Sequence, residues 1–235
     1  MDRIVYRQLH EGDIEFAHEM NKTEQWNDTI EDLTRLLEYE PDGCFLAELN
    51  GIPIGHVFSI SYGKLGWIGL LIVRKTHRRM GIGRALMIEA RRYLLNHGVE
   101  TIKLEAVPEI SELYREIGFV NECDSLRFKG TRIQTTAEMS QNVVSMNEEM
   151  IDEVARFDAT YFGAERKRIL RKLHQAYPQL CFVSCSESKI LGYIMCRKAE
   201  AGHVLGPWVC VPERNEVASP LLNASLMMLD REDSV

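Results

Sequence analysis

The sequence reads Trp67-Ile68-Gly69-Leu70-Leu71-Ile72-Val73 and, after four more residues, Arg78-Arg79-Met80-Gly81-Ile82-Gly83-Arg84. The first stretch is apolar throughout and has the length of a strand, which predicts a strand covered on both faces. Beyond the second stretch, apolar residues recur at helical spacing as far as Leu94, and Gly98 supplies a stop. We therefore expect a buried strand, a glycine-containing loop and an amphipathic helix, in that order.

The loop between this strand and helix has the composition of an anion site. Gly81 and Gly83 lack a Cβ, so a phosphate can approach the main chain at a helix N-terminus, which carries roughly half a positive charge. Arg78, Arg79 and Arg84 can add charge-assisted hydrogen bonds. A diphosphate ligand fits this arrangement best.

The amino-acid sequence excludes two other kinds of phosphate-binding loop. A dinucleotide-binding fingerprint needs a third glycine at the position of Leu86. A Walker loop needs a serine or threonine after Gly-Lys, and the pair Gly63-Lys64 is followed by Leu65. The pattern that remains is Arg-x-x-Gly-x-Gly after a buried strand.

Composition narrows the class of protein. The chain has 235 residues, of which 45% are hydrophobic and 27% charged, as is typical of a soluble globular protein with one large or two modest domains. A net charge of -7 argues against a general nucleic-acid binder. Six cysteines without Cys-x-x-Cys spacing predict a reduced, cytoplasmic protein without a metal site. No membrane-length apolar run is present, so we expect no membrane partner.

The remaining loop pattern resembles the acyl-CoA-binding loop of the GNAT superfamily of N-acyltransferases. A second segment, Leu113-Tyr114-Arg115-Glu116-Ile117-Gly118-Phe119, is similar to that family's Leu-Tyr-x-x-x-Gly-Phe. The expected order of elements is also the family's: strand 4–9, helices 13–21 and 29–39, a hairpin 44–60 turning at Asn50-Gly51, strand 67–73, a helix, strand 101–107, helix 110–117 and a last strand or hairpin 119–128. The resemblance implies an α/β fold over residues 1–128, with a mixed, mostly antiparallel sheet flanked by helices.

The second half of the chain repeats the first. Residues 129–142 are polar and without apolar periodicity, which predicts a linker. Residues 143–235 then correspond to residues 6–98 at an offset of 137, since Cys44-Phe45 and Gly55 correspond to Cys181-Phe182 and Gly192. We therefore expect a duplicated fold whose second copy is partial.

The second copy lacks the anion loop. At the same offset Arg78, Arg79, Gly81 and Gly83 fall on Asn215, Glu216, Ala218 and Pro220, and each change opposes diphosphate binding. We expect this domain to bind no cofactor. Its strand 204–211 would be an open edge, which we expect the first domain or a partner chain, as in a homodimer, to cover.

The resemblance also implies roles for particular residues. The main chain of Leu71, Ile72 and Val73 would pair with the pantetheine arm of acetyl-CoA, and an N–H near Leu71 would polarise the thioester carbonyl. Tyr114 matches the tyrosine near the CoA sulfur, as a proton donor or a thiol-positioning group. The diphosphate would lie on Arg78, Arg79, Met80, Gly81, Ile82, Gly83 and Arg84.

The acceptor side is less well defined by the sequence. An amine must lose a proton before attack, yet strand 67–73 has no titratable group. The candidate bases are Glu105, Glu24, Asp28 and His56, with Glu105 the first choice. Trp26, in the connection between the first two helices, and Trp208, the counterpart of Leu71, are expected to line the acceptor site.

These observations predict an N-acyltransferase that moves an acetyl group from acetyl-CoA to a primary amine by direct attack, without a metal. The acceptor, a small molecule or a peptide, is not identified by the sequence. The alternative is a non-catalytic acyl-CoA sensor or assembly subunit, which the missing strand carboxylate and the partial second domain favour. A nucleic-acid module is disfavoured by the acidity of the chain.

Overall fold

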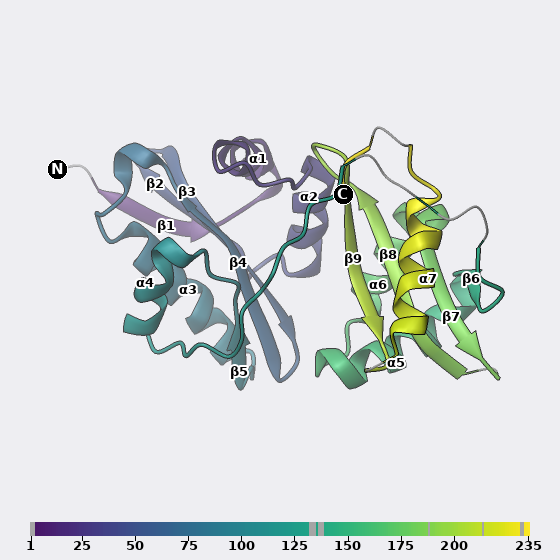
Figure 1. Ribbon diagram of the computed structural model, residues 1–235. Helices are drawn as coiled ribbons and strands as arrows, with labels where there is room; N and C mark the ends of the chain where they lie inside the picture. The colour runs from purple at the N-terminus through teal and green to yellow at the C-terminus, as the bar shows by residue number, and fades with distance from the viewer. Residues whose placement is uncertain (1–2, 132–134, 136–138, 188, 213, 231–232) are drawn as a thin grey trace. The chain divides into compact units, whose positions relative to one another are not determined.

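The computed structural model describes residues 3–131, 135, 139–187, 189–212, 214–230 and 233–235. The chain divides into two compact units, Met1–Leu126 and Arg127–Val235, each with its own sheet (Figure 1). The expected linker 129–142 includes residues 132–134 and 136–138, which lie outside the described residues.

The first unit has a sheet of five strands in the order β1-β2-β3-β4-β5. Neighbouring strands are antiparallel except β4 and β5, which are parallel. The elements are β1 (Ile4–Gln8), α1 (Ile14–Thr23), α2 (Ile30–Tyr39), β2 (Phe45–Leu49), β3 (Ile52–Tyr62), β4 (Leu65–Val73), α3 (Ile82–Asn96), β5 (Thr101–Lys103) and α4 (Ser111–Glu116). The mixed, mostly antiparallel sheet flanked by helices is confirmed.

Local sequence accounts for several of these boundaries. The β2–β3 hairpin turns at Asn50 and Gly51, whose φ angles of 53° and 79° are those that a two-residue turn requires. Helix α2 begins after Thr29, whose hydroxyl accepts a hydrogen bond from the amide of Asp32 while the Asp32 carboxylate accepts one from the amide of Thr29. Turn chemistry and capping therefore fix these elements before any long-range packing.

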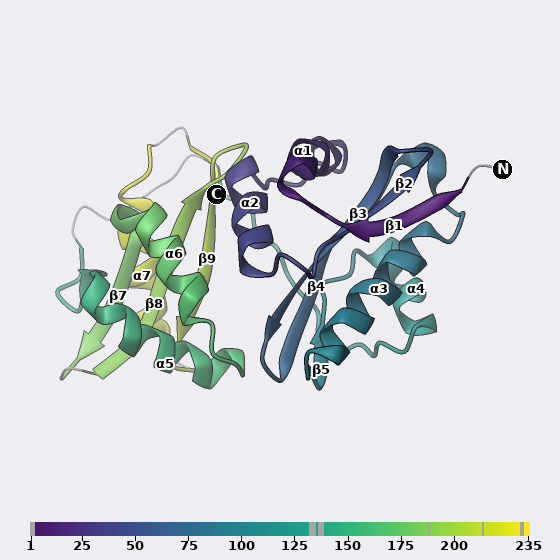
Figure 2. The same ribbon diagram turned by 180° about the vertical axis from the view of Figure 1, so that it is seen from behind.

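Helices cover both faces of this sheet (Figure 2). Helix α3 packs its buried residues Ile82, Leu86 and Leu94 against strands β2, β3 and β4. On the other face, α1 and α2 form a second core with residues such as Leu33 and Phe58. Strand β4 lies between these two layers, as its apolar sequence requires.

Two strand predictions at the end of this unit are wrong. The strand expected over residues 101–107 ends at Lys103, because β4, the strand beside it in the sheet, pairs with it no further than Trp67. Residues 119–128 form no strand or hairpin, and Val120, Leu126 and Phe128 are 86%, 74% and 88% exposed. A segment forms a strand only beside another strand, and β5 is too short to offer one.

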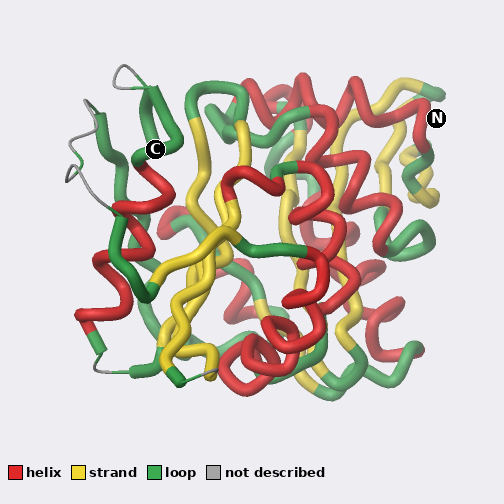
Figure 3. The backbone as a smooth tube through the Cα atoms, turned by 90° about the vertical axis from the view of Figure 1, so that its right-hand side faces the viewer, coloured by secondary structure: helices red, strands yellow, loops and turns green. Residues whose placement is uncertain are grey.

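The second unit has a four-stranded antiparallel sheet in the order β6-β7-β8-β9. In Figure 3 the strands of the chain are yellow and the helices red. Helices α5 and α6 pack on one face and α7 on the other. The elements are β6 (Val143–Ser145), α5 (Ile151–Phe162), α6 (Lys167–Ala176), β7 (Cys181–Ser186), β8 (Lys189–Lys198), β9 (His203–Cys210) and α7 (Asn215–Leu226).

The strand register shows that the two units follow one plan. Gly55 pairs with Val73 in the first unit, and Gly192 pairs with Cys210 in the second. Both residue numbers of the second pair are 137 higher than those of the first. The offset also holds at the other end, where Gln8 pairs with Phe45 and Ser145 with Phe182. The duplication predicted from the sequence thus extends to residue-by-residue pairing in the sheets.

Strand β9 is the last strand of its sheet, as expected. At the start of β9, the amide of His203 donates a hydrogen bond to the carbonyl of Ser234 at 2.8 Å. That the first domain or a partner chain covers this edge stays a prediction.

Candidate active site

Strands β4 and β5 separate to leave a gap in the first sheet. Their pairing ends at Trp67 and Lys103, and beyond this point no strand of the described chain pairs with β4 on that side. A cavity of about 40 Å³ occupies the gap. Its walls come from the connection between α1 and α2, from β4, from α3, from the residues after β5 and from α4. The lining residues are Trp26, Ile68, Gly69, Leu70, Leu71, Met87, Leu104, Glu105, Val107, Ile110 and Tyr114.

A β-bulge bends β4 at the level of this cavity. His56 pairs with Ile72 and Phe58 with Gly69, so Leu70 and Leu71 together lie opposite Val57. Leu70 has a φ of 50°, a left-handed conformation that is rare for a bulky side chain. The bulge increases the local bend of β4 and so separates the strand from β5. Residues in such strained conformations commonly mark functional sites.

The predicted anion loop follows the same strand. Arg79 and Gly81 have φ angles of 62° and 79°, which turn the main chain tightly ahead of Ile82, the first residue of α3. No side chain caps the N-terminus of α3. The first amides of a helix have no partner within it, and a Cβ built at Gly81 would meet no atom within 4 Å. This open cradle of amides fits a diphosphate.

The arginines of the loop differ in their surroundings. Arg78 donates from Nε to the carbonyl of Val73 at 2.9 Å and from Nη2 to Oε1 of Glu24, so its guanidinium is fixed beside the end of β4. Arg79 and Arg84 are exposed. All three arginines are thus exposed, and the guanidinium of Arg78 is in addition held by hydrogen bonds to the protein, a distinction that the sequence did not reveal.

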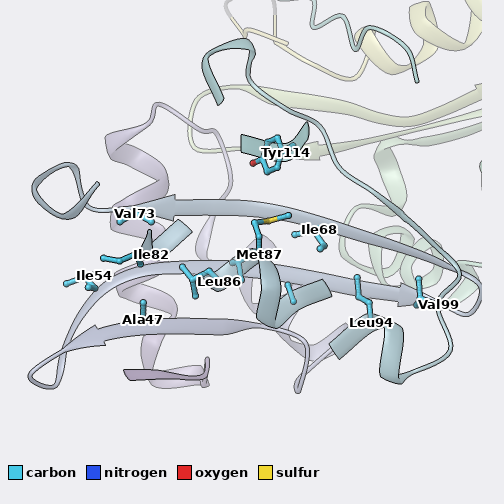
Figure 4. Close-up of a cluster of buried hydrophobic side chains, with 12 residues drawn as sticks. Ala47, Ile54, Ile68, Val73, Ile82, Leu86, Met87, Leu94, Val99 and Tyr114 are labelled. Atoms are coloured by element: carbon cyan, nitrogen blue, oxygen red, sulfur yellow. The ribbon is translucent and has the colours of Figure 1, made fainter. Parts of the chain in front are cut away.

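Four of the predicted site residues come together around the cavity: Trp26, Leu71, Glu105 and Tyr114. Figure 4 shows Tyr114 of α4 near Ile68 of β4 and Met87 of α3. The ring of Tyr114 is 7% exposed and packs edge-on against Phe119, with 6.1 Å between the ring centroids. Burial raises the pKa of its phenol to about 12. The roles assigned to these residues stay predictions.

The other candidate bases lie elsewhere. Glu24 accepts the hydrogen bond from Arg78, and Asp28 accepts one from the side-chain amide of Asn21 at 3.2 Å. His56 is fully buried between Phe16 and Phe58, and burial lowers its pKa to about 4. Of the four carboxylate and imidazole candidates, Glu105 is the one that lines the cavity.

Some residues of the cavity wall were not predicted from the sequence. Met87, Leu104, Val107 and Ile110 contribute apolar surface to it. Met87 belongs to the apolar stripe of α3, where a sequence cannot distinguish a cavity wall from ordinary core. Glu105 was placed on a strand and in fact follows one, so its side chain borders the gap where β5 has ended.

The counterpart of the anion loop in the second unit is helical. Helix α7 begins at Asn215, which corresponds to Arg78, whereas α3 begins one turn later in the matching numbering, at Ile82. Pro220 stands inside this helix. The segment that forms a glycine-rich turn in the first unit is thus taken into a helix. Trp208, predicted for the acceptor site, lies on β9 of the second unit and is 38% exposed.

The described part of the chain has neither a cluster of metal-binding side chains nor a helix of membrane-spanning character. No group of three or more histidine, cysteine, aspartate or glutamate side chains there is arranged to hold a metal ion. None of the helices in that part combines the length and the apolar character needed to span a bilayer.

Comparison with known proteins matches both units to acetyltransferases. The acetyltransferase (GNAT) family model matches residues 13–119, and an acetyltransferase (GNAT) domain model matches residues 154–232. The chain is 25% identical over 194 residues to the holothin acyltransferase of a Pseudoalteromonas species. The match covers 82% of this chain and 65% of that protein, which is less than two thirds of its length.

Two further similarities extend over almost the whole chain. The uncharacterized N-acetyltransferase YitH of Bacillus subtilis is 23% identical over 223 residues, covering 94% of this chain and 77% of YitH. A crystal structure of a candidate acetyltransferase from Pyrococcus horikoshii has the same fold, with a TM-score of 0.78 at 24% identity, covering 99% of this chain and 78% of that one.

Proposed function

Because this chain belongs to the GNAT family of acetyltransferases, we propose that its first unit transfers an acetyl group from acetyl-CoA to a primary amine. One observation carries the proposal. The cavity between β4 and β5 collects Trp26, Leu71, Glu105 and Tyr114, and the strand that forms its wall leads directly into the anion loop. A donor held by its phosphates on the loop would extend its thioester along β4 to this cavity.

The donor site is built mainly from main chain. The amides at the start of α3 and the side chains of Arg78, Arg79 and Arg84 would bind the diphosphate. The main chain of Leu71, Ile72 and Val73 would hold the amide-bearing arm on the side of β4 that β5 leaves free. When bound, acetyl-CoA supplies the activated acyl group, and these contacts orient it.

Three residues would then act on the reacting atoms. The amide near Leu71 would donate to the carbonyl oxygen, where negative charge develops as the amine adds to the carbonyl carbon. Glu105 would accept the proton that the amine loses, directly or through water. The C–N bond forms and the C–S bond breaks, which leaves an amide and a thiolate.

Tyr114 would stabilise this thiolate. A phenol with a pKa of about 12 stays protonated at neutral pH and can donate a hydrogen bond to sulfur. Full proton transfer to a thiolate is uphill, because ordinary thiols have a pKa near 8.5. We therefore propose a hydrogen-bonding and positioning role for the Tyr114 hydroxyl, with the final protonation of the thiolate left to solvent.

The test is release of CoA from acetyl-CoA, corrected for hydrolysis, across a panel of amines. The panel contains polyamines, amino acids, aminoglycosides, peptides and holothin, the acceptor named in the Pseudoalteromonas relative. We expect turnover with at least one amine, and a loss of turnover in Glu105→Gln at unchanged CoA affinity. Tight CoA binding without turnover on any amine would instead support an acyl-CoA sensor.

A further inference from the structure

A salt bridge joins the anion loop to the connection between α1 and α2. Nη2 of Arg78 donates to Oε1 of Glu24, and the side chains of the two residues are 41% and 24% exposed. The same carboxylate oxygen lies 3.4 Å from the hydroxyl of Thr23. Since Nε of Arg78 is held by the carbonyl of Val73, the guanidinium bridges the end of β4 and the end of α1.

Glu24 and the cavity residue Trp26 belong to one tight turn. The amides of Glu24 and Trp26 donate to the carbonyl of Asn21 at 3.1 and 3.0 Å, and the amide of Gln25 donates to the carbonyl of Lys22 at 3.1 Å. Gln25 has a φ of 59°. A turn closed by three hydrogen bonds moves as a unit, so a displacement of Glu24 is passed to Trp26.

A diphosphate on the anion loop would compete with Glu24 for Arg78. Carboxylate and phosphate oxygens are acceptors for the same guanidinium N–H groups, and two anions beside one cation repel each other. Binding at the loop would therefore weaken the salt bridge and release the turn that carries Trp26. The wall of the cavity would respond to the phosphates of the donor even though it does not touch them.

We propose that Glu24 is a positioning residue that couples the donor's phosphate site to the Trp26 wall of the cavity. The inference rests on the proposed function, because it assumes that a CoA thioester occupies the loop. Coupling between two sites acts equally in both directions, so an amine against Trp26 would change donor affinity by the same factor. Partly exposed salt bridges contribute modestly, so we expect a factor of about 1.5 to 5.

The experiment uses Trp26 as its own reporter. In the full chain, Trp67→Phe and Trp208→Phe leave Trp26 as the single tryptophan. The probes are CoA and adenosine 3′-phosphate 5′-diphosphate, which carries the phosphates of CoA without the pantetheine arm. Binding is followed by calorimetry and by Trp26 fluorescence. Glu24→Gln keeps an acceptor for Arg78 but removes the charge. As a matched control, Glu19→Gln removes an exposed charge from α1, the helix that Glu24 follows.

We expect both probes to change the Trp26 fluorescence of the parent and of Glu19→Gln. In Glu24→Gln the nucleotide should bind about 1.5 to 5 times more tightly, because the competing carboxylate is gone, and its effect on Trp26 should disappear. An equal fluorescence change in Glu24→Gln, or none in the parent with the nucleotide bound, would overturn the coupling alone. Failure of the parent to bind CoA would overturn the proposed function as well.

Discussion

Replacement of Gly81 by aspartate tests the anion loop most directly. Gly81 stands immediately before α3 with a φ of 79°, and a Cβ there would meet no atom within 4 Å. A side chain at this position therefore fits the space and meets only backbone strain, about 1–2 kcal/mol for an ordinary L-residue in the left-handed region. Asparagine and aspartate tolerate this region better than other residues, so Gly81→Asn is the matched control.

The two variants differ by one charge at the place where the diphosphate would lie. Two unit charges 4 Å apart repel by about 1 kcal/mol in water and by about 4 kcal/mol at the effective dielectric of a protein surface. Gly81→Asp should therefore bind CoA about 5-fold to several hundred-fold more weakly than Gly81→Asn. Both should unfold at similar denaturant concentrations, since they share the same strain.

Calorimetric titration of CoA into the parent and both variants measures this difference. We expect one CoA per chain in the parent, because the second unit lacks the loop. Equal affinity of Gly81→Asp and Gly81→Asn would show that no phosphate lies beside residue 81. A stoichiometry of two would show that the second unit also binds CoA, and both results would contradict the assignment of the site.

Three further predictions concern other groups of the chain. Tyr114→Phe should lower kcat about 10- to 100-fold with little change in the KM for acetyl-CoA, because a hydrogen bond to a charged group contributes about 1.5–3 kcal/mol. An unchanged kcat at saturating substrate would exclude a hydrogen bond from Tyr114 to the departing thiolate. His56 has a pKa of about 4 in the folded protein and about 6.5 in the unfolded chain, so between these pH values it binds fewer protons when folded than when unfolded. The free energy of unfolding should therefore fall by up to about 3 kcal/mol as the pH decreases through that window. His56→Leu removes the titrating ring and should therefore reduce this dependence in denaturant titrations. It breaks no hydrogen bond of normal geometry, since neither ring nitrogen has one within the described residues. An unchanged pH profile would exclude His56 as the cause. Asp158→Ala should destabilise the second unit by about 3–5 kcal/mol in urea, because it leaves Arg166, whose side chain is 16% exposed and donates to both carboxylate oxygens at 2.7 and 2.8 Å, without its counter-ion. A loss below about 1 kcal/mol would show that water or another group replaces the carboxylate.

Local signals determined much of this protein. The turn at Asn50-Gly51 lies where the sequence predicted it. The capping box at Thr29, which was not predicted, also acts within a few residues. The arginine- and glycine-containing loop after the β4 strand also lies where the sequence put it, because a positive φ at Gly81 is a property of glycine itself. The offset of 137 residues between the two copies was found in the sequence and recurs in the strand pairing of both sheets.

Tertiary structure decided the features that depend on distant neighbours. Residues 119–128 read as a strand, yet they lack one, because a strand exists only where another offers its hydrogen bonds and β5 stops at Lys103. The same early end of β5, with the bulge at Leu70, opens the cavity and gathers Trp26, Glu105 and Tyr114 from distant parts of the chain. The bridge between Glu24 and Arg78 likewise joins residues 54 positions apart, a separation at which sequence pattern carries no information about contact.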